Sequence, residues 1–185
     1  IEAFKKIKRV DFLPQDLKNL AELNEALPIG SSQTISQPLV VAFMLELLEP
    51  KEGEKILDVG SGSGWTTGLL GEIVGDKGRV FAVEVVPELK EFGEKNVSKY
   101  DFIKTGRVQF ICADGSKGFK KCSPYDKILV SASSRSGISE ELKDQLKIGG
   151  RLVCPIKDSI WLFFKKNKNE FQEKKYPGFI FVPLV

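Results

Sequence analysis

The sequence predicts an α/β fold: a Rossmann-like, doubly wound and mostly parallel seven-stranded sheet with an antiparallel C-terminal hairpin. Short apolar runs rich in β-branched residues alternate with longer amphipathic segments along the centre of the chain. These runs are almost wholly apolar, which is typical of parallel strands that are covered on both faces. Near the C-terminus two apolar runs are separated only by a polar stretch, which favours a hairpin.

The predicted elements follow in order along the chain. Residues 38–49 are expected to form a helix that is apolar over most of its circumference and packs under the sheet edge. Parallel strands are predicted at residues 55–59, 79–84, 107–112, 126–132 and 150–156. Helices are predicted between them at residues 65–74, 87–98 and 140–147.

Local signals support two of these helices. Pro87 suits the first turn of its helix, and Glu91 and Lys95 are spaced as an i,i+4 ion pair. Gly149 and Gly150 form a stop signal after residues 140–147.

The C-terminal hairpin is predicted from two apolar runs, residues 159–164 and 179–184. The stretch between them, residues 165–177, carries five lysines that Glu170 and Glu173 interrupt. We interpret it as a solvated hairpin tip, and a nucleic-acid contact is the less favoured alternative.

Composition limits the chemistry that this chain can perform. Its 185 residues include 28 Lys and Arg against 25 Asp and Glu, a net charge of +3, and no histidine. A Ser-His-Asp triad, a Cys-His dyad and a His-ligated zinc site are therefore excluded. The length and the lack of a linker predict one domain over residues 1–185. Within it we distinguish residues 1–50, residues 51–156 with the alternating strands and helices, and residues 157–185 with the hairpin.

The cysteines indicate neither a disulfide framework nor a metal site. Cys112, Cys122 and Cys154 are odd in number, widely spaced and without a CxxC pattern, so we expect reduced thiols and no bound metal. Cys112 and Cys154 lie inside apolar runs and are expected to be small buried hydrophobic residues. With no recognisable signal peptide and no run of ~20 apolar residues, we expect a cytoplasmic protein without a membrane span.

The strongest local signal is the segment KILDVGSGSG at residues 55–64. An apolar strand carries Asp58 at its end, the chain turns through Gly60, Gly62 and Gly64, and a helix begins at Trp65. Glycines allow a sharp turn and a close approach to a ligand, and the helix N-terminus offers unpaired N–H donors. The turn therefore predicts a nucleotide-like ligand without deciding which one.

Carboxylates follow the next two strands. Glu84 ends the second strand, 24 positions after Gly60, where a carboxylate can accept both hydrogen bonds of a ribose diol. An ordinary solvated strand end is the alternative. Asp114 and Gly115 follow the third strand at the same edge, although Asp-Gly is also a common turn pair.

The spacing of the glycines separates two candidate ligands. A dinucleotide site uses GxGxxG at the pyrophosphate, whereas this turn reads GxGxG and follows the acidic Asp58. Acidic residues suit a cationic ligand without phosphate, and S-adenosylmethionine carries an ammonium, a sulfonium and a ribose diol. The residues therefore favour a methyl donor over NAD.

With the polar and irregular segment at residues 27–37 added, the sequence resembles the protein-L-isoaspartate O-methyltransferases, a family of class I S-adenosylmethionine-dependent methyltransferases. Loops of this composition often carry function, and the most specific piece of the resemblance is ALPIGSSQTISQP at residues 26–38. The other pieces follow in the family's order: DVGSGSG (58–64), ADG (113–115), SPYDKILVSA (123–132), LKDQLKIGGRLVCPI (142–156) and FVPLV (181–185).

The resemblance implies a role for whole segments and for individual residues. Residues 1–50 would form a helical segment and the active-site loop, and residues 51–156 the cofactor-binding core. Ser36 matches the family's active-site serine, Glu84 would hold the ribose, and Asp114 with Gly115 would border the adenine. The complete set expected to bind the cofactor is Gln33, Thr34, Ile35, Asp58, Gly60, Ser61, Gly62, Gly64, Glu84, Val85, Asp114 and Gly115. The implied substrate is a protein or peptide with an L-isoaspartyl residue, whose free carboxylate is methylated so that repair can begin. The cofactor would leave as S-adenosylhomocysteine.

This chemistry suits a chain without histidine. A carboxylate with a pKa of roughly 4 is already anionic at neutral pH, so its attack on the sulfonium methyl removes no proton. Ser36 would hold that carboxylate in line, although a serine here is also a favoured N-cap for the helix at residues 38–49.

Two other functions stay open. One is a related methyltransferase with a different acceptor, which the SASS sequence at residues 131–134 would allow. The other is a non-catalytic domain that binds the cofactor or damaged peptides. We expect a monomer that binds neither nucleic acid nor a membrane.

Overall fold

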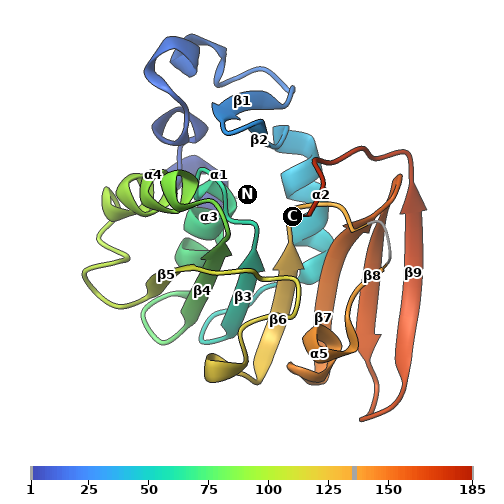
Figure 1. The fold of residues 1–185 in the computed structure, drawn as a ribbon. Helices are drawn as coiled ribbons and strands as arrows, with labels where there is room; N and C mark the ends of the chain where they lie inside the picture. The colour runs from blue at the N-terminus through green and yellow to red at the C-terminus, as the bar shows by residue number, and fades with distance from the viewer. Residues whose placement is uncertain (1, 135–136, 185) are drawn as a thin grey trace.

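A single seven-stranded sheet organises the structure, a computed structural model that describes residues 2–134 and 137–184. The sheet has the order β5-β4-β3-β6-β7-β8-β9, and a separate hairpin, β1–β2, stands apart from it (Figure 1). The strands are β1 (Leu27–Gly30), β2 (Gln33–Ile35), β3 (Lys55–Val59), β4 (Arg79–Glu84), β5 (Val108–Cys112), β6 (Tyr125–Val130), β7 (Leu146–Ile156), β8 (Ser159–Lys165) and β9 (Phe171–Pro177). Strands β3 to β7 pair in parallel, and β8 and β9 pair antiparallel. The predicted fold is therefore confirmed.

The order of the strands creates a crevice at one edge of the sheet. From β3 the chain moves outward to β4 and β5, and then it returns to place β6 on the other side of β3. The connection from β3 leads to β4 on one side, and the connection from β6 leads to β7 on the other side. The two connections therefore separate at the carboxyl ends of β3 and β6. This topological switch point is where open α/β sheets bind ligands.

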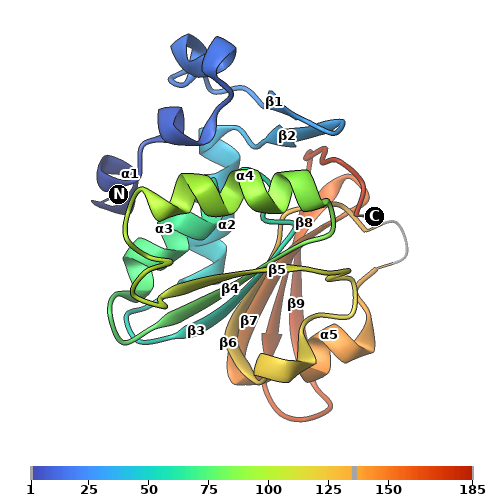
Figure 2. The same ribbon diagram turned by 60° about the vertical axis from the view of Figure 1, so that its left-hand side comes forward.

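Helices cover both faces of the sheet. The helices are α1 (Glu2–Lys6), α2 (Pro38–Leu48), α3 (Trp65–Val74), α4 (Pro87–Ser98) and α5 (Glu140–Asp144). Figure 2 shows α2, α3 and α4 on one face and α5 on the other. Successive side chains of β3 point to opposite faces of the sheet. Ile56 belongs to the core beneath α2–α4, whereas Leu57 and Val59 belong to the core on the α5 side. Burial on both faces explains the unbroken apolar runs of the central strands.

The second strand of the C-terminal hairpin differs from the prediction. The strand β9 lies within the stretch interpreted as a solvated tip, and it pairs with β8 from Lys165 opposite Phe171 to Ser159 opposite Pro177. The prediction of a strand at residues 179–184 was wrong. That segment instead crosses back over the sheet, where Ser133 exchanges backbone hydrogen bonds with Val182 and Leu184. The edge strand β9 is mostly exposed, so its polar sequence carried no apolar pattern.

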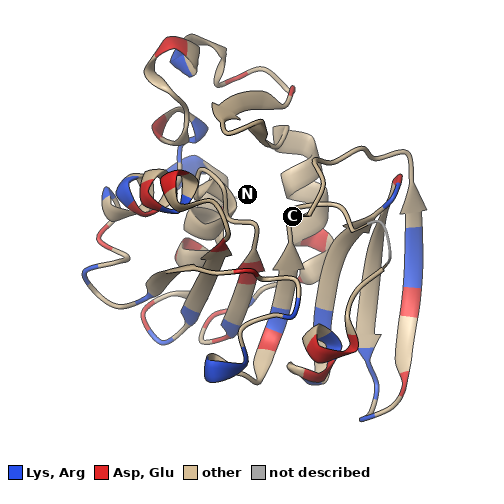
Figure 3. Ribbon diagram, in the orientation of Figure 1, with Lys and Arg blue, Asp and Glu red and all other residues tan. Residues whose placement is uncertain are grey.

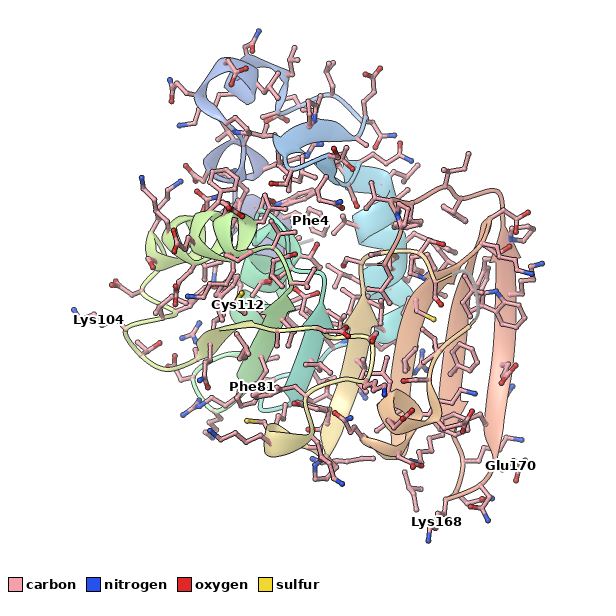
Figure 4. The ribbon with its side chains drawn as sticks, in the orientation of Figure 1. Phe4, Phe81, Lys104, Cys112, Lys168 and Glu170 are labelled. Carbon is pink, nitrogen blue, oxygen red and sulfur yellow. The ribbon has the colours of Figure 1, made fainter. Side chains whose placement is uncertain are left out.

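Lys165 also departs from the prediction of a solvated lysine. Its side chain is buried, and the ammonium group donates to the carbonyls of Lys143 at 3.0 Å and Leu146 at 2.9 Å, at the end of α5. The actual tip is the short turn after Lys165, where Lys168 and Glu170 point away from the sheet (Figure 4).

Several element boundaries need smaller corrections. The helix α2 ends at Leu48 and packs across β6, β7 and β8 rather than under an edge. The predicted helix at residues 140–147 stops at Asp144, because Leu146 already pairs with Tyr125 and Gly149–Gly150 lie inside β7. The ion pair on α4 joins Lys90 to Glu94, and no pair between Glu91 and Lys95 is present among the described residues.

Two further expectations concern small local features. Cys154 is buried as expected, whereas Cys112 is exposed at the end of the edge strand β5, so that expectation was wrong (Figure 4). Residues 27–37 are not an irregular loop, because β1 and β2 form a hairpin with a two-residue turn at Ser31 and Ser32, both with positive φ. Val185, the last residue of the FVPLV piece, lies outside the described residues.

Candidate active site

A cavity lies at the carboxyl ends of β3, β4 and β6, below the β1–β2 hairpin. It encloses about 740 Å³, part of it open to solvent, a volume in the range of small-molecule sites. The hairpin, the glycine turn, the ends of the three strands and the C-terminal segment supply its walls. The lining residues are 29, 33–36, 59–63, 65, 66, 83–86, 113, 115, 131, 132 and 182–184.

The glycine turn forms the floor of this cavity. Gly60, Gly62 and Gly64 have φ values of +76°, +51° and +83°, a region that side chains disfavour. Both Gly60 and Ser61 donate backbone hydrogen bonds to the carbonyl of Val83, at 2.8 and 3.3 Å, so the turn is fixed to β4. A Cβ atom at Gly64 would lie 2.8 Å from the carbonyl oxygen of Gly93, so this glycine is required for the packing of α4.

Glu84 lies in the wall directly beside the turn. Its side chain is buried, and its two carboxylate oxygens accept hydrogen bonds from the backbone N–H of Gly62 at 2.8 Å and of Val86 at 3.1 Å. A solvated strand end would have no such partners, so that alternative is wrong. Each carboxylate oxygen keeps a lone pair that can accept a hydroxyl donor from a ligand.

Ser36 stands where this cavity meets a second one. The second cavity encloses about 690 Å³, also partly open, and is lined by Ala26, Thr34, Ser36, Gln37, Val40, Ser131, Ile180, Phe181 and Val182. Four residues line both cavities: Thr34, Ser36, Ser131 and Val182. The shared wall thus contains three residues with a hydroxyl group and one valine, and none of the described residues that line the second cavity is charged.

The backbone explains why the Ser36 hydroxyl is available to a ligand. The N-cap of α2 is Gln37, which makes no side-chain capping bond. Ser36 therefore does not cap the helix as the alternative proposed. Its carbonyl accepts a hydrogen bond from Arg9 at 3.2 Å, which fixes the main chain of a residue that lines both cavities.

Asp58 lies beneath the turn rather than in the cavity wall. It is completely buried, and one oxygen accepts a hydrogen bond from the Thr67 hydroxyl at 2.6 Å while the other has no partner among the described residues. Burial raises its pKa to about 7; the bond from Thr67 opposes this rise and the charge of Glu84 adds to it.

Two other residues of the predicted set also lie outside the wall. Gly64 is the N-cap of α3, and Asp114 is an exposed residue whose carboxylate accepts the backbone N–H of Ser116 at 2.8 Å, a bond that holds its pKa below the ordinary value. The structure does bring together the remaining members of the predicted set: Gln33, Thr34, Ile35, Gly60, Ser61, Gly62, Glu84, Val85 and Gly115.

Sequence reasoning missed several lining residues. Ser131 follows β6, the neighbour of β3, so the rule that ligands bind at carboxyl ends of parallel strands was a signal for it. Residues 182–184 reach the cavity only because the C-terminal segment crosses the sheet, and no local pattern indicated this path.

The walls fit a cofactor that donates hydrogen bonds. Ser61 lines the cavity and its buried hydroxyl has no partner among the described residues, so a ligand can supply one. Within residues 2–134 and 137–184 no three acidic, cysteine or histidine side chains gather as a metal site would require. In the same ranges, no helix is both long and apolar enough to span a membrane.

Comparison with known proteins gives a consistent answer. The family model for protein-L-isoaspartate(D-aspartate) O-methyltransferase matches residues 1–185. Protein-L-isoaspartate O-methyltransferases of Methanopyrus kandleri and Thermococcus onnurineus are each 41% identical to the whole chain, which spans 82% and 84% of their lengths. A Plasmodium falciparum structure described as this enzyme in complex with S-adenosyl-L-homocysteine superimposes with a TM-score of 0.89 at 24% identity, over 100% of this chain and 88% of that one. Its low identity supports the fold alone, but the family match and the two relatives extend over the full chain: the protein belongs to the protein-L-isoaspartate(D-aspartate) O-methyltransferase family.

Proposed function

We propose that the protein transfers a methyl group from S-adenosylmethionine to the free carboxylate of L-isoaspartyl residues in damaged proteins or peptides, and so starts their repair. The observation that carries this proposal is the pair of adjoining cavities with a shared wall of hydroxyl groups. One cavity suits the donor and the other the acceptor, and Ser36 stands between them. The curated relatives are named for this activity.

The first cavity holds the cofactor in this proposal. Glu84 accepts hydrogen bonds from the ribose, and the backbone of Gly60, Ser61 and Gly62 surrounds the methionyl part. Gln33, Thr34 and Ile35 cover it from the hairpin, and Val85 and Gly115 border the adenine. When bound, the cofactor supplies an electrophilic methyl group on a sulfonium.

The residues of the chain position the acceptor rather than activate it. The isoaspartyl carboxylate arrives already ionised, so no side chain has to remove a proton. The Ser36 hydroxyl donates a hydrogen bond to it and holds it in line with the methyl group. Val40, Phe181 and Val182 contribute apolar wall that excludes water, which strengthens each polar contact in the site.

The three predicted residues outside the wall act indirectly. Asp58 supports the turn through its bond with Thr67, which lies in α3 just after the glycines. Gly64 permits the close packing of α4 against the turn, and Asp114 shapes the loop that presents Gly115.

The test is methylation of a matched pair of peptides. The protein is incubated with labelled S-adenosylmethionine and a peptide that contains L-isoaspartate, with the L-aspartyl peptide of the same sequence as control. We expect label on the isoaspartyl peptide only. Labelling of both peptides, or of another protein carboxylate, would indicate the related methyltransferase with a different acceptor. Binding of the cofactor without any labelling would indicate the non-catalytic domain.

The proposal also covers the domain organisation, oligomeric state and cellular location of the protein. We propose a single methyltransferase domain that works as a monomer in the cytoplasm and does not bind nucleic acid. Light scattering gives the mass in solution, and a mass of twice 20.6 kDa would contradict the monomer.

A further inference from the structure

The buried cation Arg9 makes an unusual set of contacts. Its side chain lies in the η1 turn (Arg9–Phe12), and the residue is only 6% exposed. One guanidinium nitrogen donates to the carbonyls of Ala21 at 3.1 Å and Leu23 at 3.0 Å, and the other donates to those of Glu25 at 2.6 Å and Ser36 at 3.2 Å. Among the described residues no carboxylate lies within ion-pair distance of it.

These four carbonyls belong to the two ends of the β1–β2 hairpin. Residues 21–25 form the irregular segment that leads into β1, and Ser36 follows β2 directly. The hairpin is not part of the main sheet (Figures 1 and 2), so β1 and β2 pair with each other and not with its strands. Arg9 therefore joins the segment before β1 to the residue after β2.

Arg9 also contacts a residue that lines the cofactor cavity. Its guanidinium carbon lies 5.5 Å from the ring centroid of Trp65, the first residue of α3. The Trp65 ring packs edge-on against Phe4, labelled in Figure 4, and its Nε1 donates to the carbonyl of Ile7 at 3.4 Å. Arg9 thus lies between the hairpin and the helix that begins at the glycine turn.

The main chain of Arg9 is itself held firmly. Phe12, three residues later, is fully buried and stacks on Tyr100 with ring centroids 5.9 Å apart. A Cβ atom added at Gly68 of α3 would lie 3.0 Å from the Phe12 ring, so the η1 turn is packed directly on that helix. The guanidinium therefore extends from a fixed base to the hairpin.

Uncharged residues of the described part of the chain line the second cavity around Ser36. Among residues 2–134 and 137–184 no charged residue lines the second cavity, and Figure 3 shows β2 and the first turns of α2 without charged residues. The Arg9 guanidinium reaches this region through the Ser36 carbonyl, so it acts on the main chain and not on a ligand.

We propose that Arg9 is a positioning residue for methyl transfer, which holds Ser36 and its hairpin in register with the cofactor cavity. The inference rests on the proposed function, in which the Ser36 hydroxyl contacts the acceptor carboxylate. Without the guanidinium the ends of the hairpin lose four charge-assisted hydrogen bonds, and the Ser36 hydroxyl is no longer held in line. Small displacements of a positioning group can cost about 100-fold in rate.

The experiment compares Arg9→Met and Arg9→Lys with a matched control. Arg107 is a partly buried arginine whose Nε has no partner among the described residues. It lies over the Phe102 ring at 4.6 Å, donates to the carbonyl of Gly71 and pairs with the Asp76 carboxylate, away from both cavities. For each variant we would measure kcat and KM for the isoaspartyl peptide, the Kd for S-adenosylhomocysteine and the melting temperature. The assays are run at a temperature at which every variant is folded.

We expect Arg9→Met to lower kcat about 10- to 100-fold and to change the Kd for S-adenosylhomocysteine less than about threefold. Arg9→Lys, which keeps a charged donor, restores part of kcat. Arg107→Met lowers the melting temperature to a similar extent but leaves kcat within about twofold. Wild-type kcat in folded Arg9→Met, or an equal loss of kcat in Arg107→Met, would overturn the proposal.

A double variant tests whether Arg9 acts through Ser36. If it does, Arg9→Met combined with Ser36→Ala is about as slow as Ser36→Ala alone, because the second change removes nothing further. If the double variant instead lost kcat by the product of the two single losses, Arg9 would act independently of Ser36, and the proposal would be overturned. Backbone hydrogen exchange separates this inference from the proposed function: even in an enzyme inactive on isoaspartate, Arg9→Met must speed exchange over residues 21–36 and Arg107→Met must not.

Discussion

The carboxylate of Glu84 accepts a hydrogen bond from the backbone N–H of Gly62 over 2.8 Å. This bond joins the end of β4 to the middle of the glycine turn, so one buried side chain both shapes the floor of the cavity and lines its wall. The ligand site and the turn are consequently coupled through Glu84.

Glu84→Ala is expected to weaken cofactor binding about 10- to 100-fold, because hydrogen bonds to a charged acceptor contribute about 1.5–3 kcal/mol. The cofactor affinity of Glu84→Gln should lie between those of Glu84→Ala and the wild type, since an amide keeps only one oxygen acceptor. Titration calorimetry with S-adenosylhomocysteine measures the change, and Glu88→Gln on the exposed first turn of α4 is the control for charge. Undiminished affinity in Glu84→Ala would remove Glu84 from the binding site.

Ser36→Ala is expected to lower kcat for the isoaspartyl peptide by about one to three powers of ten, because the carboxylate is no longer held in line and misplacement alone can cost about 100-fold. The affinity for S-adenosylmethionine should stay nearly constant, because the role proposed for the hydroxyl is to contact the acceptor. Stability should also change little, since Gln37 and not Ser36 is the N-cap of α2. Initial rates with saturating cofactor measure the effect. Turnover equal to that of the wild type would show that the hydroxyl does not orient the acceptor.

Asp58 makes stability depend on pH with a defined sign. Its folded pKa is raised to about 7 by burial, so between pH 4 and pH 7 the folded state binds more protons than the unfolded state. The free energy of unfolding therefore falls as pH rises through this window, by up to about 4 kcal/mol from this group, and its contribution becomes constant above pH 7.

Asp58→Asn isolates this contribution. Its amide oxygen can still accept the Thr67 hydroxyl, but it does not ionise. Urea unfolding between pH 4 and pH 8 should therefore show that the variant gains stability relative to the wild type as the pH increases. A constant difference between the two proteins across the whole range would contradict the raised pKa.

Gly93→Ala is expected to damage both stability and cofactor binding. A Cβ atom at this position in α4 would lie 2.7 Å from the carbonyl oxygen of Gly62 and 2.9 Å from the Phe110 ring, so the helix must move away from the turn. Overpacking of this kind costs about 1–3 kcal/mol. Gly71→Ala in α3 is the matched control, because its Cβ would press on Phe102 and Val108, away from the glycine turn.

Both glycine variants are compared by urea unfolding and by titration with S-adenosylhomocysteine. Both should lose stability, but only Gly93→Ala should lose affinity by more than about threefold, since only this substitution displaces the turn. Equal affinities would mean that the turn adapts without consequence for the ligand.

The central part of the fold was accessible from the sequence because each element carries its own signal. Buried on both faces, β3 and β4 read as continuous apolar runs with correct boundaries at both ends. The helix α4 was found over its full length from Pro87 to Ser98. By contrast, β9 is exposed at the sheet edge and pairs mainly through its backbone, which leaves no apolar pattern.

The candidate site likewise contains residues that local motifs predicted and residues whose positions they did not predict. The glycine turn, Glu84 and the segment that contains Ser36 are local motifs, and the structure brings them to one cavity. Asp58 was expected to face a cationic ligand, yet it lies below the cavity, because whether a side chain at a strand end points into the crevice depends on the register of the sheet. Cys112 was expected to be buried, but an edge strand leaves it exposed.

The sequence by itself determined the class of fold, the family motifs and the absence of histidine, because these depend on residue type and local spacing. Only the tertiary structure decided that residues 180–182 line the second cavity, that Gln37 and not Ser36 is the N-cap of α2, and that Arg9 donates to the carbonyl of Ser36, 27 positions along the chain. The contacts of residues 180–182 and of Arg9 join segments that are distant in the chain. Their geometry follows from how the sheet, the hairpin and the C-terminal segment pack together, and no local pattern of residues encodes it.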